Sequence, residues 1–250
     1  MENLLIERLR TGETLVFGHR GASASAPMNT IPAFELAAQM GAQGVELDVQ
    51  RSADGHAVIV HDFTVDSTTD GSGLVNTKTL AELKALDAGS WKSDEFTGTR
   101  VPTLDEVFEA VGQQLFINVE IKSRGLRTDG VEQVAADCIR RHGMQPRVIV
   151  SSFNPLALRR FRRILPDVPL GHLTVPGLPF IVRMTGLGLK TEAIHPNYRQ
   201  INSDYMARHQ SQIVNTWTVN DAETARELRN LGVGVIITDQ PDTLLHALAE

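Results

Sequence analysis

Short runs rich in valine and isoleucine alternate with amphipathic segments along most of this chain, and this alternation limits the possible folds more than any other feature. Strands joined through a helix pair in parallel, because the helix supplies the length that a crossover needs. The runs that we expect to be strands are residues 14–19, 44–50, 115–122, 147–153, 168–173, 192–198, 212–219 and 233–239. The helices that we expect between most of them are residues 30–41, 103–113, 131–143, 155–166, 202–210 and 221–232.

Eight strand–helix units in 250 residues predict an α/β fold of the closed (β/α)8 type, a TIM barrel. The alternative is an open doubly wound sheet. A further apolar run, residues 56–62, follows the second strand after only RSADG, which is too short for a crossover and contains the hairpin signal Asp-Gly. We therefore expect this run to extend the second strand in the antiparallel direction.

Residues 62 to about 102 are polar and rich in glycine, and they precede the next expected helix. Polar insertions on a barrel usually cover the face that carries the function. The sequence contains no domain linker and no low-complexity tract. We therefore expect residues 1–250 to form a single barrel domain, with a small insertion after the second strand at about 62–102.

Composition and charge indicate a globular protein with 42% hydrophobic and 22% charged residues. The net charge of -6 and the absence of a long basic run argue against nucleic acid or an anionic membrane as the main partner. The N-terminal residues do not fit a secretory signal. The weakly polar stretch 173–189 is broken by Pro176, Pro179 and Arg183, so we expect no stable membrane insertion. We expect a cytoplasmic protein, and the oligomeric state stays open.

The chain has one cysteine, Cys138, which lies in the expected helix 131–143. A single cysteine cannot form an intramolecular disulfide, and we expect an inert, partly buried thiol and no thiolate metal site.

Polar side chains gather at the carboxyl ends of the expected strands, where parallel barrels carry their active sites. Residues two apart on a strand share a face, and the apolar residues between them face the helices. These polar residues are His19 and Arg20 after the first strand, Glu46 and Asp48 on the second, His61 and Asp62 after the hairpin, and Glu120 and Lys122 on the third. Taken singly, each could be a solvated strand end or an internal ion pair, but their shared position favours one site.

Three carboxylates in one barrel mouth would repel each other unless a cation compensates them. A divalent ion does so, and an all-oxygen ligand set favours Mg²⁺ or Ca²⁺ over zinc. With that ion, Arg20 and Lys122 make the site suited to an anion. Two histidines can serve as base and acid near neutral pH, so the set predicts phosphoryl chemistry. Six further histidines lie in turns, on helices or at other strand ends, where we expect structural or surface roles.

Ordered motifs extend over nearly the whole chain. The most specific are GHRG and NTIPAFELAAQMGAQGVELDVQRSADGHAVIVHD, and they are followed by TTDGSGLV, VPTLDEVF, NVEIK, SSFNPLAL, NTWTVN and IITDQPD. With these motifs the chain resembles the glycerophosphodiester phosphodiesterase family of the barrel-type phosphodiesterase superfamily. The resemblance implies a catalytic (β/α)8 barrel that hydrolyses a glycerophosphodiester to glycerol 3-phosphate and an alcohol.

The resemblance also implies roles for individual residues. His19 and His61 would be the catalytic acid–base pair, and one Mg²⁺ or Ca²⁺ ion would be held by Glu46, Asp48 and Glu120. Arg20 and Lys122 would hold the phosphate, and Trp217 would pack against the glycerol or head group unless it is a core aromatic. In one route a glycerol hydroxyl attacks first, and water then opens the cyclic phosphate.

The chain departs from the family pattern at Met28, where Pro-Glu-Asn-Thr is usual and Pro-Met-Asn-Thr stands here. Methionine cannot replace a carboxylate as a strong hydrogen-bond acceptor or a ligand of a hard cation. If the usual glutamate orients Arg20 or supports the metal, activity or metal preference should change. Two alternatives therefore stay open: a related phosphodiesterase that acts on a lysophospholipid, and a phosphodiester-binding pseudoenzyme weakened by Met28.

Overall fold

The computed structural model describes residues 3–177 and 184–249. The strands are β1 Leu15–His19, β2 Gly44–Arg51, β3 Ala57–Ile59, β4 Phe116–Ile121, β5 Val148–Ser152, β6 Leu170–Thr174, β7 Ala193–Pro196, β8 Ile213–Thr216 and β9 Val235–Thr238. The helices are α1 Leu4–Leu9, α2 Ile31–Gln39, α3 Leu80–Ala85, α4 Leu104–Val111, α5 Val131–Arg141, α6 Pro155–Ile164, α8 Ser203–Arg208, α9 Ala222–Asn230 and α10 Pro241–Ala249. Short 3-10 turns are η1 Val75–Thr77, η2 Asp94–Phe96, η3 Gln145–Arg147 and η4 Tyr198–Gln200.

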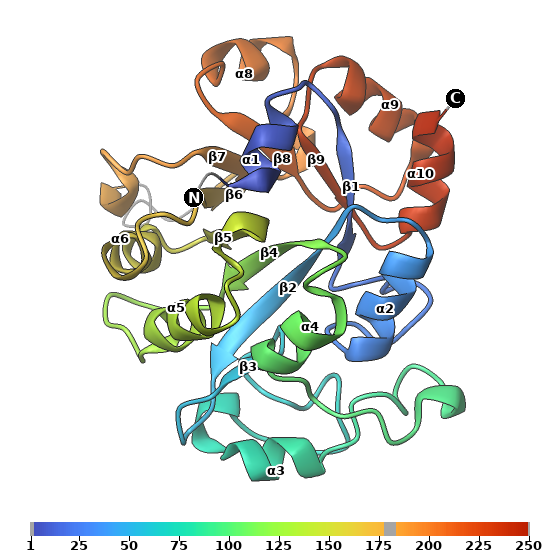
Figure 1. Cartoon of the computed structure of the whole chain (residues 1–250), viewed down its shortest axis with the longest axis vertical. Coiled ribbons are helices and arrows are strands. Elements are labelled where there is room, and N and C mark those ends of the chain that lie inside the picture. Colours follow the sequence, from blue (N-terminus) through green and yellow to red (C-terminus); the bar gives the residue numbers. More distant parts are fainter. Residues whose placement is uncertain (1–2, 178–183, 250) are drawn as a thin grey trace.

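The strands close into a barrel, because β1 pairs in parallel with both β2 and β9. In the described part of the chain, eight parallel strands follow one another in the order β1-β2-β4-β5-β6-β7-β8-β9 (Figure 1). β3 pairs antiparallel with β2, and Val49 lies opposite Ile59. The TIM barrel and its antiparallel extension are therefore confirmed, and the open sheet is excluded.

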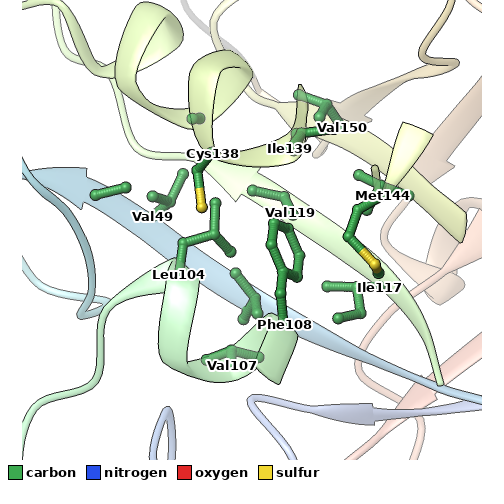
Figure 2. Packing of buried hydrophobic residues seen from close by; sticks show 14 of the residues in the cluster. Val49, Leu104, Val107, Phe108, Ile117, Val119, Cys138, Ile139, Met144 and Val150 are labelled. Atoms are coloured by element: carbon green, nitrogen blue, oxygen red, sulfur yellow. The ribbon is translucent and has the colours of Figure 1, made fainter. Parts of the chain in front are cut away.

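The largest group of buried apolar side chains fills the layer between the strands β2, β4 and β5 and the helices around them. Figure 2 shows part of it, where Leu104 and Phe108 from α4 lie with Cys138 from α5 above the sheet. Leu47 and Val49 of β2 belong to the same layer. Because side chains alternate along a strand, the residues between them point into the barrel, which is the face that carries the site.

Helix α1 closes the end of the barrel at which the strands begin. Its Leu5 and Leu9 pack with Phe17 and Ile149 from inside the barrel, and in Figure 1 the helix lies across the barrel in the view. The side chain of Asn3 caps α1 and also donates to the carbonyl of Val148. The sequence analysis did not predict this helix. A helix of six residues is too short to be stable alone, so its packing decides that it forms.

The insertion after β3 has a small apolar core of its own. Its buried residues include Val65, Val75 and Leu83, which pack with Val58 of β3. In Figure 1 this segment, which contains α3, lies beyond β3 at one edge of the barrel. The insertion therefore rests on the antiparallel extension that the sequence predicted.

Two contacts join the insertion to loops at the carboxyl ends of the strands. The ammonium group of Lys92 donates to the carbonyl oxygens of Ser23 at 2.9 Å and Ala24 at 2.8 Å, in the loop between β1 and α2. The guanidinium of Arg124, in the loop after β4, stacks 3.6 Å from the centre of the Phe63 ring. The insertion thus holds two loops that border the mouth of the barrel.

A lysophospholipid substrate would favour an exposed apolar rim, for which the sequence offers one candidate segment, residues 176–184. Of that segment, residues 178–183 lie outside the described residues. Among the helices of the described part of the chain, none has both the length and the apolar composition that crossing a bilayer would need.

Candidate active site

The carboxyl ends of the strands enclose a cavity of about 130 Å³. The polar strand-end residues predicted from the sequence and Trp217 all line it except Asp48 and Asp62. Asp48 is buried and contacts Arg20 and Lys122. Five further residues line the cavity. Asn118 lies on β4, and the other four come from later strands and the segments after them: Phe153, Leu173, Thr218 and Ile237. The cavity therefore has a charged half, built by β1 to β4, and a largely apolar half, built by β5 to β9.

In the turn after β1, Arg20 and Asn29 both adopt a left-handed backbone conformation. Arg20 has φ 56° and Asn29 has φ 59°, a left-handed conformation that costs energy in residues other than glycine. The backbone N–H of Asn29 donates to the backbone carbonyl of Arg20 at 3.0 Å, which ties the two residues together. Gly21 has φ 84°, and a Cβ there would lie 2.5 Å from the backbone of Ala33 in α2. Strain gathered in this way is typical of a functional loop.

The three carboxylates predicted to bind a metal are buried together. Glu46, Asp48 and Glu120 each offer an oxygen, and these oxygens all lie within 4.8 Å of one another. Burial, together with the charges of Asp48 and Glu120, raises the pKa of Glu46 well above its usual value. Burial and the charge of Asp48 raise the pKa of Glu120 to about 7. Two of the three groups are therefore hard to ionise without a compensating cation.

Arg20 and Lys122 both contact Asp48. Arg20 Nε lies 3.2 Å from Asp48 Oδ2, and Lys122 Nζ lies 3.4 Å from Asp48 Oδ1. Burial works to raise the pKa of Asp48, but the two cations outweigh it and the pKa is lowered. Lys122 Nζ also lies 2.9 Å from Glu120 Oε1. Asp48 is therefore the carboxylate that stays ionised, and it holds both cations at the mouth.

Asn29 supports this cluster, although the sequence analysis gave it no role. Its side-chain nitrogen donates to Asp48 Oδ2 at 2.8 Å, and its side-chain oxygen accepts from the Asp48 amide at 3.3 Å. The residue is buried. Its place in the PMNT motif is the signal that could have identified it.

Each predicted catalytic histidine forms a pair with an aspartate through Nδ1. His19 Nδ1 lies 2.7 Å from Asp239 Oδ1, and His61 Nδ1 lies 2.8 Å from Asp62 Oδ1. An Nδ1–H bonded to a carboxylate fixes the tautomer and leaves Nε2 for chemistry. Burial lowers the pKa of His61, and the positive charges of Arg20 and Lys122 lower it further. Of the two histidines, His61 is therefore the one favoured to be neutral and able to accept a proton.

Asp239 is the second functional residue that the sequence analysis missed, although it lies in the motif IITDQPD. Besides His19, it accepts hydrogen bonds from Ser23 at 2.9 Å and Asn220 at 2.6 Å. Burial opposes ionisation of Asp239, but the hydrogen bonds from His19 and Asn220 outweigh it, and its pKa is lowered strongly. The ionised carboxylate can stabilise positive charge on His19.

Trp217 lies on the apolar side of the cavity. It is half-buried, and its ring meets that of Phe153 edge-on with centroids 5.5 Å apart. The indole nitrogen donates to the carbonyl of His195 at 3.0 Å, which fixes the orientation of the ring. One face of this residue belongs to the core, and the rest borders the cavity.

Met28 contacts Arg20. Its sulfur lies 3.2 Å from Arg20 Nη1, and it borders a small neighbouring hollow and not the cavity itself. A glutamate at this position would reach the same guanidinium. Of the two roles open for the usual glutamate, the geometry favours orientation of Arg20. The methionine leaves that cation with one fewer carboxylate partner.

A second group of potential ligands lies away from the cavity, between α4 and α5. Asp105, Cys138 and His142 have ligand atoms within 4.8 Å of one another, a proximity that the sequence analysis did not expect of the single cysteine. The carboxylate of Asp105 already pairs with the guanidinium of Arg141. It also lies 2.8 Å from His142, measured from Oδ1 to Nε2. Burial raises the pKa of the Cys138 thiol. Asp105 therefore already has two partners, and Cys138 is buried where partial burial was expected.

Comparison with known proteins bears on the assignment of this site. The model of the glycerophosphoryl diester phosphodiesterase family matches residues 19–243. A glycerophosphodiester phosphodiesterase from Caldanaerobacter subterraneus subsp. tengcongensis is 42% identical over 239 residues, which is 94% of this chain and 97% of the relative. This chain belongs to that family.

Solved structures agree with this membership. A phosphodiesterase from Oleispira antarctica in complex with the product sn-glycerol-3-phosphate has 31% identity and a TM-score of 0.86, over 97% of this chain and 99% of that one. A glycerophosphodiester phosphodiesterase from Agrobacterium tumefaciens has 30% identity and a TM-score of 0.79, over 94% and 100% of the two chains. The family resemblance read from the motifs is confirmed, and with it the prediction that the chain is a phosphodiesterase, a hydrolase.

Proposed function

We propose that this chain hydrolyses glycerophosphodiesters to glycerol 3-phosphate and an alcohol, with one divalent cation, Mg²⁺ or Ca²⁺. The observation that carries the proposal is the convergence of three buried carboxylates, two cationic side chains and two histidines at one small cavity. The relative from Oleispira antarctica, which was solved with glycerol 3-phosphate, supports the same product for this chain.

The buried carboxylates suit a hard divalent cation. Glu46, Asp48 and Glu120 offer only oxygen, the ligand that Mg²⁺ and Ca²⁺ prefer. When all three carboxylates are ionised, they carry one negative charge more than Arg20 and Lys122 balance, and a divalent ion would reverse this excess. When bound, the ion supplies positive charge that stabilises the charge developing on the phosphate oxygens. Arg20 and Lys122 would bind the phosphate from the same side of the cavity.

The two histidine–aspartate pairs divide the proton transfers. His61, whose pKa is lowered, takes the proton from the attacking hydroxyl through Nε2. His19 gives a proton to the departing oxygen, and the ionised Asp239 holds the His19 ring through Nδ1 so that Nε2 faces the reaction. The attacking hydroxyl is that of glycerol in a two-step route or that of water in a direct one.

The proposed function is tested by hydrolysis of glycerophosphocholine and glycerophosphoethanolamine by metal-stripped protein, with Mg²⁺, Ca²⁺ or no metal added. We expect glycerol 3-phosphate to be released only when metal is present. Activity that survives chelation would overturn the metal dependence. Folded protein that binds the ion but turns over neither substrate would support the binding-protein alternative, for which the contact between Met28 and Arg20 is the structural reason. Turnover of a lysophospholipid alone would establish the other alternative.

Asp239→Asn is expected to lower kcat by about 100-fold with little change in KM, because an amide no longer stabilises a protonated His19. The shape of the pH–rate profile should also change, because the hydrogen-bond partner of His19 is altered. The matched control is Asp167→Asn, which changes an exposed carboxylate in the turn before β6. An unchanged kcat and an unchanged pH profile would show that Asp239 does not position the catalytic histidine.

We also propose that residues 1–250 form one catalytic domain in which residues 62–102 cover part of the mouth. Two contacts support this view. Lys92 of the insertion donates to Ser23 in the loop after β1, and Arg124 in the loop after β4 stacks on Phe63 of the insertion. The cytoplasmic location inferred from the sequence stays a prediction.

A further inference from the structure

Asn118 is a buried amide on the wall of the cavity. It lies on β4, in register with Glu46 on β2, and only 2% of its surface is exposed. In the described part of the chain, neither its side-chain oxygen nor its side-chain nitrogen has a hydrogen-bond partner. The residue nevertheless lines the cavity. A buried amide with both polar atoms unpaired carries a desolvation penalty that a leucine of similar size would avoid.

Other buried polar side chains inside the barrel differ from Asn118. Ser151, His195 and Asn215 also have unpaired polar atoms, yet none of them is among the residues that line the cavity. His195 Nε2 lies 3.0 Å from the side-chain nitrogen of Asn215, so these two residues have each other as partners. Of these four buried neutral side chains, Asn118 is the one that borders the space where a substrate would lie, and both of its polar atoms are unpaired.

We propose that Asn118 recognises a hydroxyl group of the glycerol part of the substrate. This inference rests on the proposed function and identifies a specificity residue for it. Nothing in the comparisons assigns the residue a role. The asparagine amide presents one donor group and one acceptor side by side, and an alcohol hydroxyl is both a donor and an acceptor.

The other ligands of the site match this amide less well. A phosphate diester oxygen only accepts, so it would leave the Asn118 oxygen unpaired and facing negative charge. A metal ion would use the oxygen and leave the nitrogen with its hydrogens unpaired. The carbon atoms next to the hydroxyl would meet Leu173, Ile237 and Trp217, which line the apolar half of the same cavity. A polyol phosphate therefore fits both halves of the site.

The test compares the binding of glycerol 3-phosphate and n-propyl phosphate, which lacks both hydroxyls, by calorimetry in the presence of Mg²⁺. We expect the unaltered protein to bind glycerol 3-phosphate about tenfold or more tightly than propyl phosphate, since one or two neutral hydrogen bonds separate the two ligands. Asn118→Leu should abolish this difference. It should leave propyl phosphate and Mg²⁺ binding within about twofold of the unaltered protein, since the charged contacts that hold both ligands are untouched.

Ser151→Ala is the matched control, because it removes an unpaired polar atom from the same barrel interior but outside the cavity lining. It should keep the preference for glycerol 3-phosphate. If Asn118→Leu does not fold, Asn118→Ser permits the same comparison, since it shortens the side chain and removes the amide.

Three outcomes would overturn the proposal. The first is no preference for glycerol 3-phosphate in the unaltered protein, and the second is a preference that persists in the Asn118 variant. The third is an equal loss of both phosphates together with weaker Mg²⁺ binding, which would make Asn118 part of the metal site. Because these measurements need no turnover, they are distinct from a failure of the unaltered protein to hydrolyse glycerophosphocholine, which would overturn the proposed function itself.

Discussion

Replacement of either His19 or His61 by alanine is expected to lower the rate of glycerophosphodiester hydrolysis by about 1000-fold, within the range that loss of a general acid or base produces. Both histidines line the cavity, and each is oriented through Nδ1 by a carboxylate. With alanine at either position, the attacking hydroxyl keeps its proton or the departing oxygen receives none. The fold should persist, because both side chains lie at the rim and not in the apolar core.

The measurement is kcat for glycerophosphocholine at saturating metal, together with the melting temperature of each variant. His56→Ala is the matched control, since this histidine is exposed in the turn before β3 and its side chain does not line the cavity. We expect its activity to match that of the unaltered protein. A rate near that of the unaltered protein in either the His19 or the His61 variant would refute the assigned proton transfers.

Glu46→Gln is expected to weaken binding of Mg²⁺ or Ca²⁺ by about 100-fold or more, because an amide retains the shape of the ligand but loses its charge. Hydrolysis at limiting metal should fall in parallel. The measurement is calorimetric titration of the metal into stripped protein. Glu35→Gln, an exposed acid on α2, is the matched control. Equal metal affinity in the two variants would exclude Glu46 as a ligand.

The same titration should depend on pH in a defined direction. In the metal-free protein the pKa of Glu120 is about 7 and that of Glu46 is also raised, so both hold protons that a metal must displace. Metal affinity should therefore rise as pH increases from 6 to 8, with release of protons into the buffer. A flat profile over this interval would show that the two carboxylates ionise without help from the metal.

The free energy of unfolding of the metal-free protein should also depend on pH, because the pKa of Glu120 is higher in the folded state than in the unfolded state. A carboxyl whose pKa is higher in the folded state than in the unfolded state favours folding at low pH, and this contribution is lost as pH rises through the folded value. For Glu120 that interval runs from about 4.5 to about 7. The metal-free protein should lose this contribution by pH 8. Added Ca²⁺ should then raise the melting temperature more at pH 8 than at pH 6.

The barrel could be predicted from the sequence because its signals are local. Alternation of short strands with helices implies parallel pairing, and the short RSADG connection implies the antiparallel β3. The side-chain period of two along a strand placed Glu46 and Asp48 on one face and Leu47 with the helices. Helix α1 escaped this logic, because its six residues are held by Leu5 and Leu9 packing against the barrel interior.

The sequence by itself therefore determined the fold, the family and the residue types that gather at the strand ends. Only the tertiary structure decided which side chains meet. Asp239 reaches His19 across 220 positions because β9 closes on β1. Asn29 reaches Asp48 through a left-handed turn, and Asn118 borders the cavity while Ser151 on the next strand does not. Periodicity records the face of an element on which a residue lies, but hydrogen bonds between elements depend on barrel closure and strand register, which no local pattern encodes.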